Sequence, residues 1–292
     1  ISSQLKKDNI DLYHGLSGEL PNGLNIPSVV TVHDLIFYRY PELYKSIDVE
    51  IHKRKVNHAV KTASKIVAIS EQTKADLIEF TATPAQNIEV IYQGCHPAFK
   101  TPYSKKFLNT ITKKYQLPKK FVLFVGTLEA RKNAMTIAKG LKDTNHYMVF
   151  VGKVKAHGEK LKTYVKENNM QDRVLFIHHI DIEDLAGIYQ NATVFCYPSF
   201  FEGFGIPIIE ALHSGVPVIT TKGGCFSEAG GSSSIYIDPH SETELQTAVE
   251  SLYAESNKSR KKRIESGFNY VQQFNDKALA KQWNRLYKSL LT

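Results

Sequence analysis

The sequence has no apolar run close to the ~20 residues that a helix needs to span a bilayer. It also has little cysteine: Cys95, Cys196 and Cys225 lie far apart and are odd in number. This arrangement excludes a disulfide framework and lacks the spacing of metal ligands. We therefore expect a protein of the reducing cytoplasm, without a membrane-spanning helix or a structural metal.

Several catalytic motifs are absent as well. There is no Gly-Lys-Ser/Thr phosphate loop and no Gly-x-Ser-x-Gly nucleophile turn. Gly203-Phe204-Gly205 lacks the third glycine and the following acid of a dinucleotide fingerprint. Aromatic residues do not alternate with basic ones as in a platform for stacked bases, so we expect no nucleic-acid partner.

The start of the chain has neither an initiator Met nor a charged-then-apolar secretory pattern, since it reads Ile1-Ser2-Ser3-Gln4. We expect part of a longer protein, with the first strand of the N-terminal domain upstream. The formal net charge is +8, and five of the basic residues lie within 258–263. This run indicates either an anionic partner, such as a nucleotide, a lipid diphosphate or a membrane surface, or the solvated face of a helix.

Short β-branched runs alternate with helical stretches along most of the chain, which is typical of parallel sheets built from βαβ units. Ser70 and Asp181 are expected to cap the helices 72–80 and 183–190, and a further helix is expected at 45–61. The expected strands are 11–16, 28–36, 65–69, 88–92, 121–126, 147–151, 174–177, 193–197, 218–221 and 235–237. From residue 241 onward the pattern is helical only.

The stretch 95–104 contains two prolines and no periodicity, so we predict an interdomain linker there. The expected domains are a partial N-terminal domain at 1–105, a second domain at 106–275, and a C-terminal helix at 276–292 that packs back on the first domain. Both domains are predicted to be Rossmann-like and doubly wound, facing a cleft. Ligands of such sheets bind beyond the carboxyl ends of the strands.

The loop after the strand 193–197 has the features of a diphosphate site. Gly203 and Gly205 allow the backbone to approach a ligand closely. Pro207 suits the first turn of a helix, and Gly215 suits the residue just past its end. The N-terminus of this short helix would therefore present free N–H groups and a positive dipole end at the edge of the sheet.

Charged side chains near this loop fit a sugar nucleotide. Glu202 and Glu210 can accept hydrogen bonds from sugar and ribose hydroxyls; the alternative is an exposed loop acid and an acid favoured by the helix dipole. After the strand 121–126, Arg131 and Lys132 can neutralise a diphosphate and stabilise its departure, unless they are simply two cations on a solvated turn.

Two histidines end strands of the first domain. His33 could polarise or position a reacting sugar, and a structural histidine is an equal alternative. His14 could line an acceptor pocket, although a structural role is favoured there.

The pair Glu202 and Glu210, with seven residues between them, resembles the signature of retaining glycosyltransferases of family 4, which have the GT-B fold. Among these it looks most like bacterial mannosyltransferases of surface-polysaccharide assembly. Further segments carry the resemblance over nearly the whole chain: His33-Asp34-Leu35, Ser70-Glu71-Gln72-Thr73, Gln93-Gly94, Gly126…Arg131-Lys132-Asn133 and Gly215-Val216-Pro217-Val218.

The resemblance implies metal-independent transfer, without a cofactor, from a nucleotide-diphosphate sugar with retention at the anomeric carbon. It implies that Arg131 and Lys132 hold the diphosphate, Glu210 binds the ribose, Glu202 contacts the donor sugar and His33 lies beside the reacting centre. It further implies backbone contacts to phosphate and sugar from Gly203, Phe204, Gly205 and Ile206. The family's first strand and its glycine-rich acceptor loop are absent from the sequence, so no acceptor residues are assigned.

We therefore expect a hexosyltransferase that moves a sugar, with mannose favoured, from a GDP- or UDP-sugar to a glycan or a lipid-linked acceptor. We expect it in the cytoplasm, with the inner face of the membrane and peripheral membrane association as further expectations. The alternatives are a sugar-nucleotide epimerase or phosphorylase on the same fold, or a non-catalytic donor-binding subunit.

Overall fold

The structure is a computed structural model that describes residues 2–291, and it contains two sheets whose neighbouring strands are all parallel. The first sheet has the order β1 (Tyr13–Gly15), β2 (Ser28–Val32), β3 (Lys65–Ala68) and β4 (Ile88–Val90). The second has the order β10 (Ile235–Ile237), β9 (Val218–Thr221), β8 (Val194–Tyr197), β5 (Phe121–Val125), β6 (Tyr147–Val151) and β7 (Val174–Ile177). All ten predicted strands are present, and the predicted α/β class with two Rossmann-like domains is confirmed.

The described residues form two compact units, each with one sheet. Unit 1 contains the residues up to Gly94, the short segment Glu202–Phe204, and the residues from Gln273 onward. Unit 2 contains Cys95–Phe201 and Gly205–Gln272. The division into domains predicted at 105/106 and 275/276 stays a prediction.

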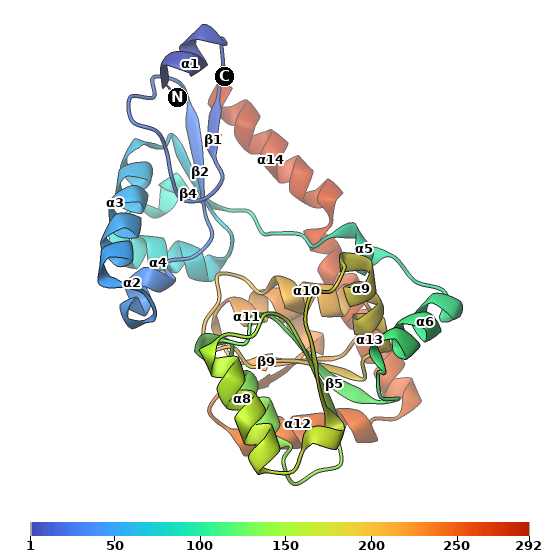
Figure 1. The fold of residues 1–292 in the computed structure, drawn as a ribbon. Helices are drawn as coiled ribbons and strands as arrows, with labels where there is room; N and C mark the ends of the chain where they lie inside the picture. The colour runs from blue at the N-terminus through green and yellow to red at the C-terminus, as the bar shows by residue number, and fades with distance from the viewer. Residues whose placement is uncertain (1, 292) are drawn as a thin grey trace. The chain divides into compact units, whose positions relative to one another are not determined.

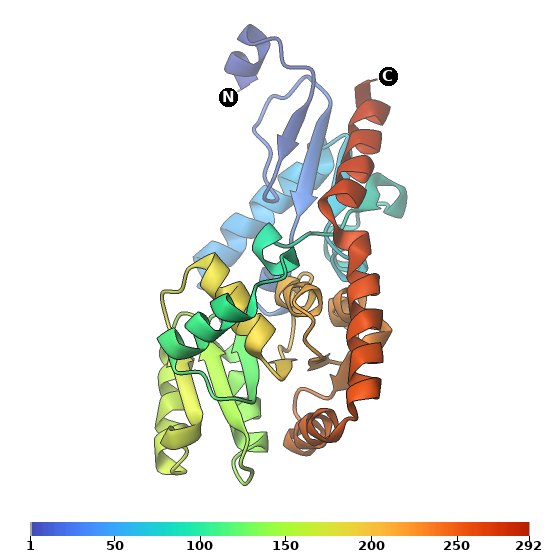
Figure 2. The ribbon, with the colours of Figure 1, turned by 90° about the vertical axis from the view of Figure 1, so that its right-hand side faces the viewer.

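Unit 2 is doubly wound, with two groups of helices beside its strands (Figure 1). One group is α7 (Ala134–Gly140), α8 (Ala156–Glu167) and α12 (Glu242–Ala254). The other is α5 (Pro97–Lys100), α6 (Lys105–Tyr115), α9 (Ile182–Asn191), α10 (Ile206–His213), α11 (Gly224–Gly230) and α13 (Asn257–Val271). Figure 2 shows α6, in green, lying against α9, in yellow.

Unit 1 also contains helices: α1 (Ser2–Lys7), α2 (Ile36–Arg39), α3 (Ser46–Thr62), α4 (Glu71–Thr81) and α14 (Asp276–Leu291). Ser70 caps α4 as predicted, because its hydroxyl accepts the N–H of Thr73 at 3.0 Å. Helix α14 packs on the sheet, where Leu279 and Leu286 share an apolar cluster with strand residues such as Val67. The last helix is therefore part of the core of unit 1.

Three local expectations differ from the structure. The strand predicted at 28–36 ends at Val32, because Asp34 accepts the N–H of Ile36 at 3.0 Å and α2 begins there. The stretch 95–104, predicted as a linker, contains α5, which buries Phe99 completely. Asp181 stands at the N-cap of α9 as predicted, but its side chain makes no capping hydrogen bond.

The basic run 258–263 lies in α13, where its members have different surroundings. Arg260 donates to the carbonyl of Thr193 at 2.6 Å, and Arg263 lies 3.0 Å from the carboxylate of Glu255. The three lysines of the run are exposed. No helix between residues 2 and 291 combines the length and the apolar character needed to cross a membrane.

We expect Leu286→Ala to destabilise unit 1 by about 2–5 kcal/mol, because it empties a buried site between α14 and the sheet. The neighbouring change Arg285→Ala is the matched control. It removes only an exposed ion pair with Glu89, and we expect a loss under about 1 kcal/mol. The measurement is the free energy of unfolding in urea; equal losses in both variants would contradict the packing of α14 on this sheet.

Candidate functional site

The order of the second sheet reverses between β5 and β8. From β5 the chain proceeds outward through β6 to β7, and then returns to place β8 on the other side of β5. Such a reversal leaves a crevice outside the carboxyl ends of the two strands, which is where open α/β sheets bind ligands. The loops that follow β5 and β8 are the two that carry most of the predicted site.

Arg131, in the loop after β5, ties these two loops together. Its guanidinium donates to the carbonyl of Phe201, and its own carbonyl accepts the N–H of Phe200 at 2.9 Å. The guanidinium also lies 3.0 Å from Glu129, whose carboxylate lies 2.9 Å from Lys155. Burial opposes ionisation of Glu129, but the hydrogen bond from Lys155 and the charge of Arg131 outweigh it and lower its pKa. The cation is therefore fixed at the reversal of the sheet.

Lys132 is held by the last residue of β8. Its ammonium donates to the hydroxyl of Tyr197 at 2.6 Å and lies 5.1 Å from the centre of the same ring. Tyr197 is buried, so the position of the ammonium is set by the core of unit 2.

Asn133 holds the loop after β5 in place through buried hydrogen bonds. The residue has a left-handed backbone with φ of 55°, and its buried amide donates to the carbonyls of Pro198 and Pro239 at 3.1 and 2.7 Å. It thereby links the loop after β5 to the loops after β8 and β10. Arg131 and Lys132 thus stand on a braced loop.

Helix α10 begins where the loop after β8 ends. Its N-cap is Gly205, with φ of 125°, a backbone conformation that favours glycine. Gly205 has no side chain to cap the helix, but its carbonyl accepts the N–H of Ile208 at 2.9 Å. Pro207 has no N–H, so among the first three helical residues Ile206 keeps an N–H without an intrahelical partner. Pro207 lies in this turn and Gly215 follows the helix with φ of 73°, both as predicted.

Glu210 lies in α10 and is largely buried. Its Oε2 accepts a hydrogen bond from the hydroxyl of Tyr189 at 2.9 Å. Burial raises the pKa of Glu210 to about 7, although the bond from Tyr189 opposes this rise. Its carboxylate is therefore charged only in part at neutral pH, and any further hydrogen-bond donor stabilises its charged form.

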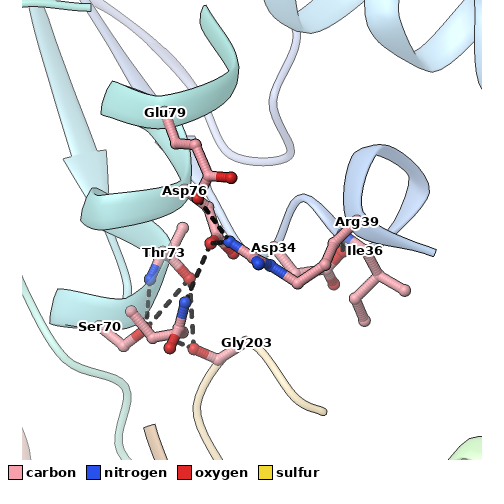
Figure 3. A network of polar contacts seen from close by, with 9 residues as sticks. Asp34, Ile36, Arg39, Ser70, Thr73, Asp76, Glu79 and Gly203 are labelled. Atoms are coloured by element: carbon pink, nitrogen blue, oxygen red, sulfur yellow. Dashed lines mark hydrogen bonds and ion pairs between the residues drawn. The ribbon is translucent and has the colours of Figure 1, made fainter. Parts of the chain in front are cut away.

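The segment Glu202–Phe204 is bound within unit 1, as Figure 3 shows for its middle residue. The carbonyl of Gly203 accepts the hydroxyl of Ser70 at 2.6 Å and that of Thr73 at 3.3 Å. A Cβ atom at this glycine would lie 2.1 Å from the carbonyl oxygen of His33, so a side chain cannot be accommodated. Glu202 is therefore adjacent to a residue whose place is fixed.

Phe204 anchors the other end of this segment. Its ring lies 5.4 Å from that of Tyr92 and 5.3 Å from that of Phe274, centre to centre. The side chain is almost completely buried, so it anchors the segment by packing.

His33 is exposed and follows β2 directly. Its Nε2 lies 2.8 Å from the carbonyl of Leu16, which can only accept, so this nitrogen carries a proton. Its Nδ1 lies 3.1 Å from the amide nitrogen of Gln93 and accepts from it. The ring borders two cavities of unit 1, of about 280 and 480 Å³, and His14 lines the larger one.

The structure thus places the predicted residues in two groups. Arg131, Lys132, Gly205, Ile206 and Glu210 lie in unit 2, whereas His33, Glu202, Gly203 and Phe204 lie in unit 1. Tyr189, Tyr197 and Glu129 touch site residues and were missed by the sequence analysis. Each lies in or beside an element or site residue that the sequence predicts. The spacing of residues in the sequence does not show, however, which side chains form hydrogen bonds between different elements of the fold.

Solved structures of similar shape define the class of the fold. Sucrose-phosphate synthase from Thermosynechococcus elongatus has a TM-score of 0.83 and 23% sequence identity, over 99% of this chain and 75% of that one. HepE from Anabaena, in complex with UDP-glucose, has a TM-score of 0.78 and 20% identity, over 91% and 73%. The chain therefore has the GT-B fold, as predicted.

Family comparison then identifies the chain. Residues 109–270 match the glycosyl transferases group 1, and residues 1–99 match Glycosyltransferase Family 4. The chain belongs to the glycosyl transferases group 1, which confirms the resemblance noted in the sequence.

Among curated proteins, O-antigen chain mannosyltransferase B from Escherichia coli is 27% identical, over 78% of this chain and 61% of that protein. O-antigen chain mannosyltransferase RfbU from Salmonella typhimurium is 26% identical, over 76% and 60%. The chain spans about three fifths of the length of these two relatives.

The raised pKa of Glu210 predicts a stability that falls as pH rises. Its pKa is about 7 in the folded chain and has an ordinary value of 4.5, so between these values the folded state keeps a proton that the unfolded state has lost. The stabilisation is complete below pH 4.5 and lost above pH 7. We expect a loss of about 3 kcal/mol across this window, from about 1.4 kcal/mol per pKa unit.

Glu210→Gln cannot titrate and is the matched control. Urea unfolding of both proteins between about pH 5 and 8 measures the difference in their pH dependence. Parallel curves for the two proteins would assign the pH dependence to other groups.

Proposed function

We propose that this chain binds a nucleotide-diphosphate sugar and transfers its hexose to a glycan or a lipid-linked acceptor, with retention at the anomeric carbon. Mannose is the favoured sugar. The observation that carries the proposal is the position of Arg131 and Lys132 at the reversal of the second sheet, where they contact β8 and the loop that leads from it to α10. Two fixed cations and a helix N-terminus without a capping side chain suit a diphosphate.

In this proposal Arg131 and Lys132 hold the diphosphate and neutralise the charge that develops on it as the bond to the sugar breaks. Amides from the Gly203–Ile206 segment contribute to phosphate and sugar binding. Fixed donors aimed at developing charge stabilise a transition state more than a ground state. The proposal assigns this role to side chains and backbone, and to no cofactor.

The remaining residues are assigned to hydroxyl groups and to the reacting sugar. Glu210 accepts hydrogen bonds from the ribose, and its partial burial strengthens them. Glu202 contacts the sugar, where positive charge develops. His33 lies beside the reacting centre, with its Nε2–H held by a backbone carbonyl.

The names of relatives support the choice of donor and acceptor. Two similar proteins are O-antigen chain mannosyltransferases, and HepE was solved with UDP-glucose. We propose GDP- or UDP-sugars as donors. We also propose that the protein acts at the cytoplasmic face of the membrane, whose anionic lipids attract the exposed lysines of α13.

A panel of sugar nucleotides in thermal unfolding tests the proposal. A ligand at 100 times its dissociation constant adds about 2.7 kcal/mol to stability, which is visible in the melting temperature. Release of nucleotide diphosphate together with a glycosylated acceptor separates a transferase from an epimerase, a phosphorylase or a silent binding subunit. Absence of stabilisation by every GDP- and UDP-sugar would refute the donor site.

Arg131→Ala and Lys132→Ala are each expected to weaken binding of GDP or UDP by about 1–3 kcal/mol, because each removes a charge-assisted hydrogen bond. Guanosine or uridine, which lack phosphate, should bind equally to the variants and the unchanged chain. Calorimetric titration measures both. Equal affinity for the diphosphates would place the two cations outside the donor site.

Glu202→Gln and Glu210→Gln are expected to change different kinetic parameters. Glu210 faces a part of the donor that does not change, so its loss should raise the Michaelis constant more than it lowers turnover. Glu202 faces developing charge, so its loss should lower turnover and leave diphosphate affinity nearly intact. Kinetics of diphosphate release, with titrations beside them, measure both; the opposite pattern would exchange the two roles.

A further inference from the structure

The hydroxyl groups of two buried tyrosines of unit 2 contact proposed donor-binding residues. Tyr189 lies in α9 and Tyr197 is the last residue of β8, and both are at most 1% exposed. Phe195 connects them, with ring centres 5.2 Å from Tyr189 and 5.8 Å from Tyr197. Because close-packed interiors leave little freedom to such rings, both hydroxyls have fixed positions.

The hydroxyl of Tyr197 accepts a hydrogen bond from the ammonium of Lys132 at 2.6 Å. A phenol is neutral near neutral pH, so this partner directs the cation without cancelling its charge. The bond therefore fixes the position of the ammonium and of its charge.

The hydroxyl of Tyr189 has the opposite role, since it donates to Oε2 of Glu210 at 2.9 Å. Burial and the neighbouring Glu210 raise the pKa of Tyr189 well above its usual range, so it stays a donor. The bond fixes one carboxylate oxygen and leaves Oε1 for a ribose hydroxyl. Other groups near Tyr189 are Tyr197 and Cys95.

We propose that Tyr189 and Tyr197 are positioning residues of the donor site, in which Tyr189 orients the carboxylate of Glu210 and Tyr197 orients the ammonium of Lys132. The inference rests on the proposed function, because it needs a ribose at the first and a diphosphate at the second. The three packed rings of Tyr189, Phe195 and Tyr197 thus set the hydrogen-bonding geometry of both the carboxylate and the ammonium.

The binding experiment compares Tyr189→Phe and Tyr197→Phe in the 292-residue chain. Tyr197→Phe should weaken GDP or UDP about tenfold and leave guanosine or uridine unchanged. Tyr189→Phe should weaken diphosphate and nucleoside by the same factor, because both contain the ribose. In the Lys132→Ala background, Tyr197→Phe should have no further effect.

Tyr115→Phe is the matched control, because it deletes a hydroxyl that donates to Asp184 at 2.7 Å, outside the site. It should leave every affinity unchanged. Thermal unfolding confirms that the three variants fold, since each keeps its ring. A loss of affinity in Tyr115→Phe equal to that in the other two variants would overturn the proposal.

A second measurement needs no ligand. The carboxyl ¹³C signal of Glu210, assigned by its absence in Glu210→Gln, reports the pKa of this group in the free chain. Tyr189→Phe should raise this pKa above about 7, because the lost bond favours the charged form. An unchanged pKa, or unchanged diphosphate affinity in Tyr197→Phe, overturns the positioning roles. Failure of the unchanged chain to bind GDP or UDP refutes the proposed function instead.

Discussion

The pairing of β5 with β8 is the contact on which the candidate donor site depends. These strands are distant in the sequence, and their register brings Val122 beside Val194. Because both run in the same direction, the loops that follow them start at one edge of the sheet. Arg131 can then donate to the carbonyl of Phe201, and a backbone bond returns from Phe200. Without that pairing, the two cations would not meet the loop that leads from β8 to α10.

Burial determines the electrostatics around this edge. Glu210 and Glu129 are both partly withdrawn from water, but their pKa values shift in opposite directions. Glu129 has Lys155 and Arg131 beside it, which outweigh its desolvation, whereas Glu210 has only the neutral hydroxyl of Tyr189 as its hydrogen-bond partner among the described residues. The charged form is thus favoured at Glu129, whereas the carboxylate of Glu210 is only partly charged at neutral pH.

The segment Glu202–Phe204 belongs to unit 1 because of its packing and hydrogen bonds. Gly203 lies against the carbonyl of His33 and accepts from Ser70 and Thr73, while Phe204 enters an aromatic cluster of unit 1. The residues on either side of this segment belong to unit 2. The two carboxylates of the signature, eight positions apart in sequence, therefore lie in different units.

The sequence by itself determined the strands, the capping of α4 by Ser70 and the ends of α10, because these depend on local periodicity and on the conformations that proline and glycine allow. Its motifs also identified the family. The tertiary structure alone decided the order of the strands, the burial of Glu210, and the contacts of Tyr189 and Tyr197. Periodicity shows that a residue is buried but not which side chain it meets, since hydrogen bonds such as Lys132 to Tyr197 join residues far apart in the chain.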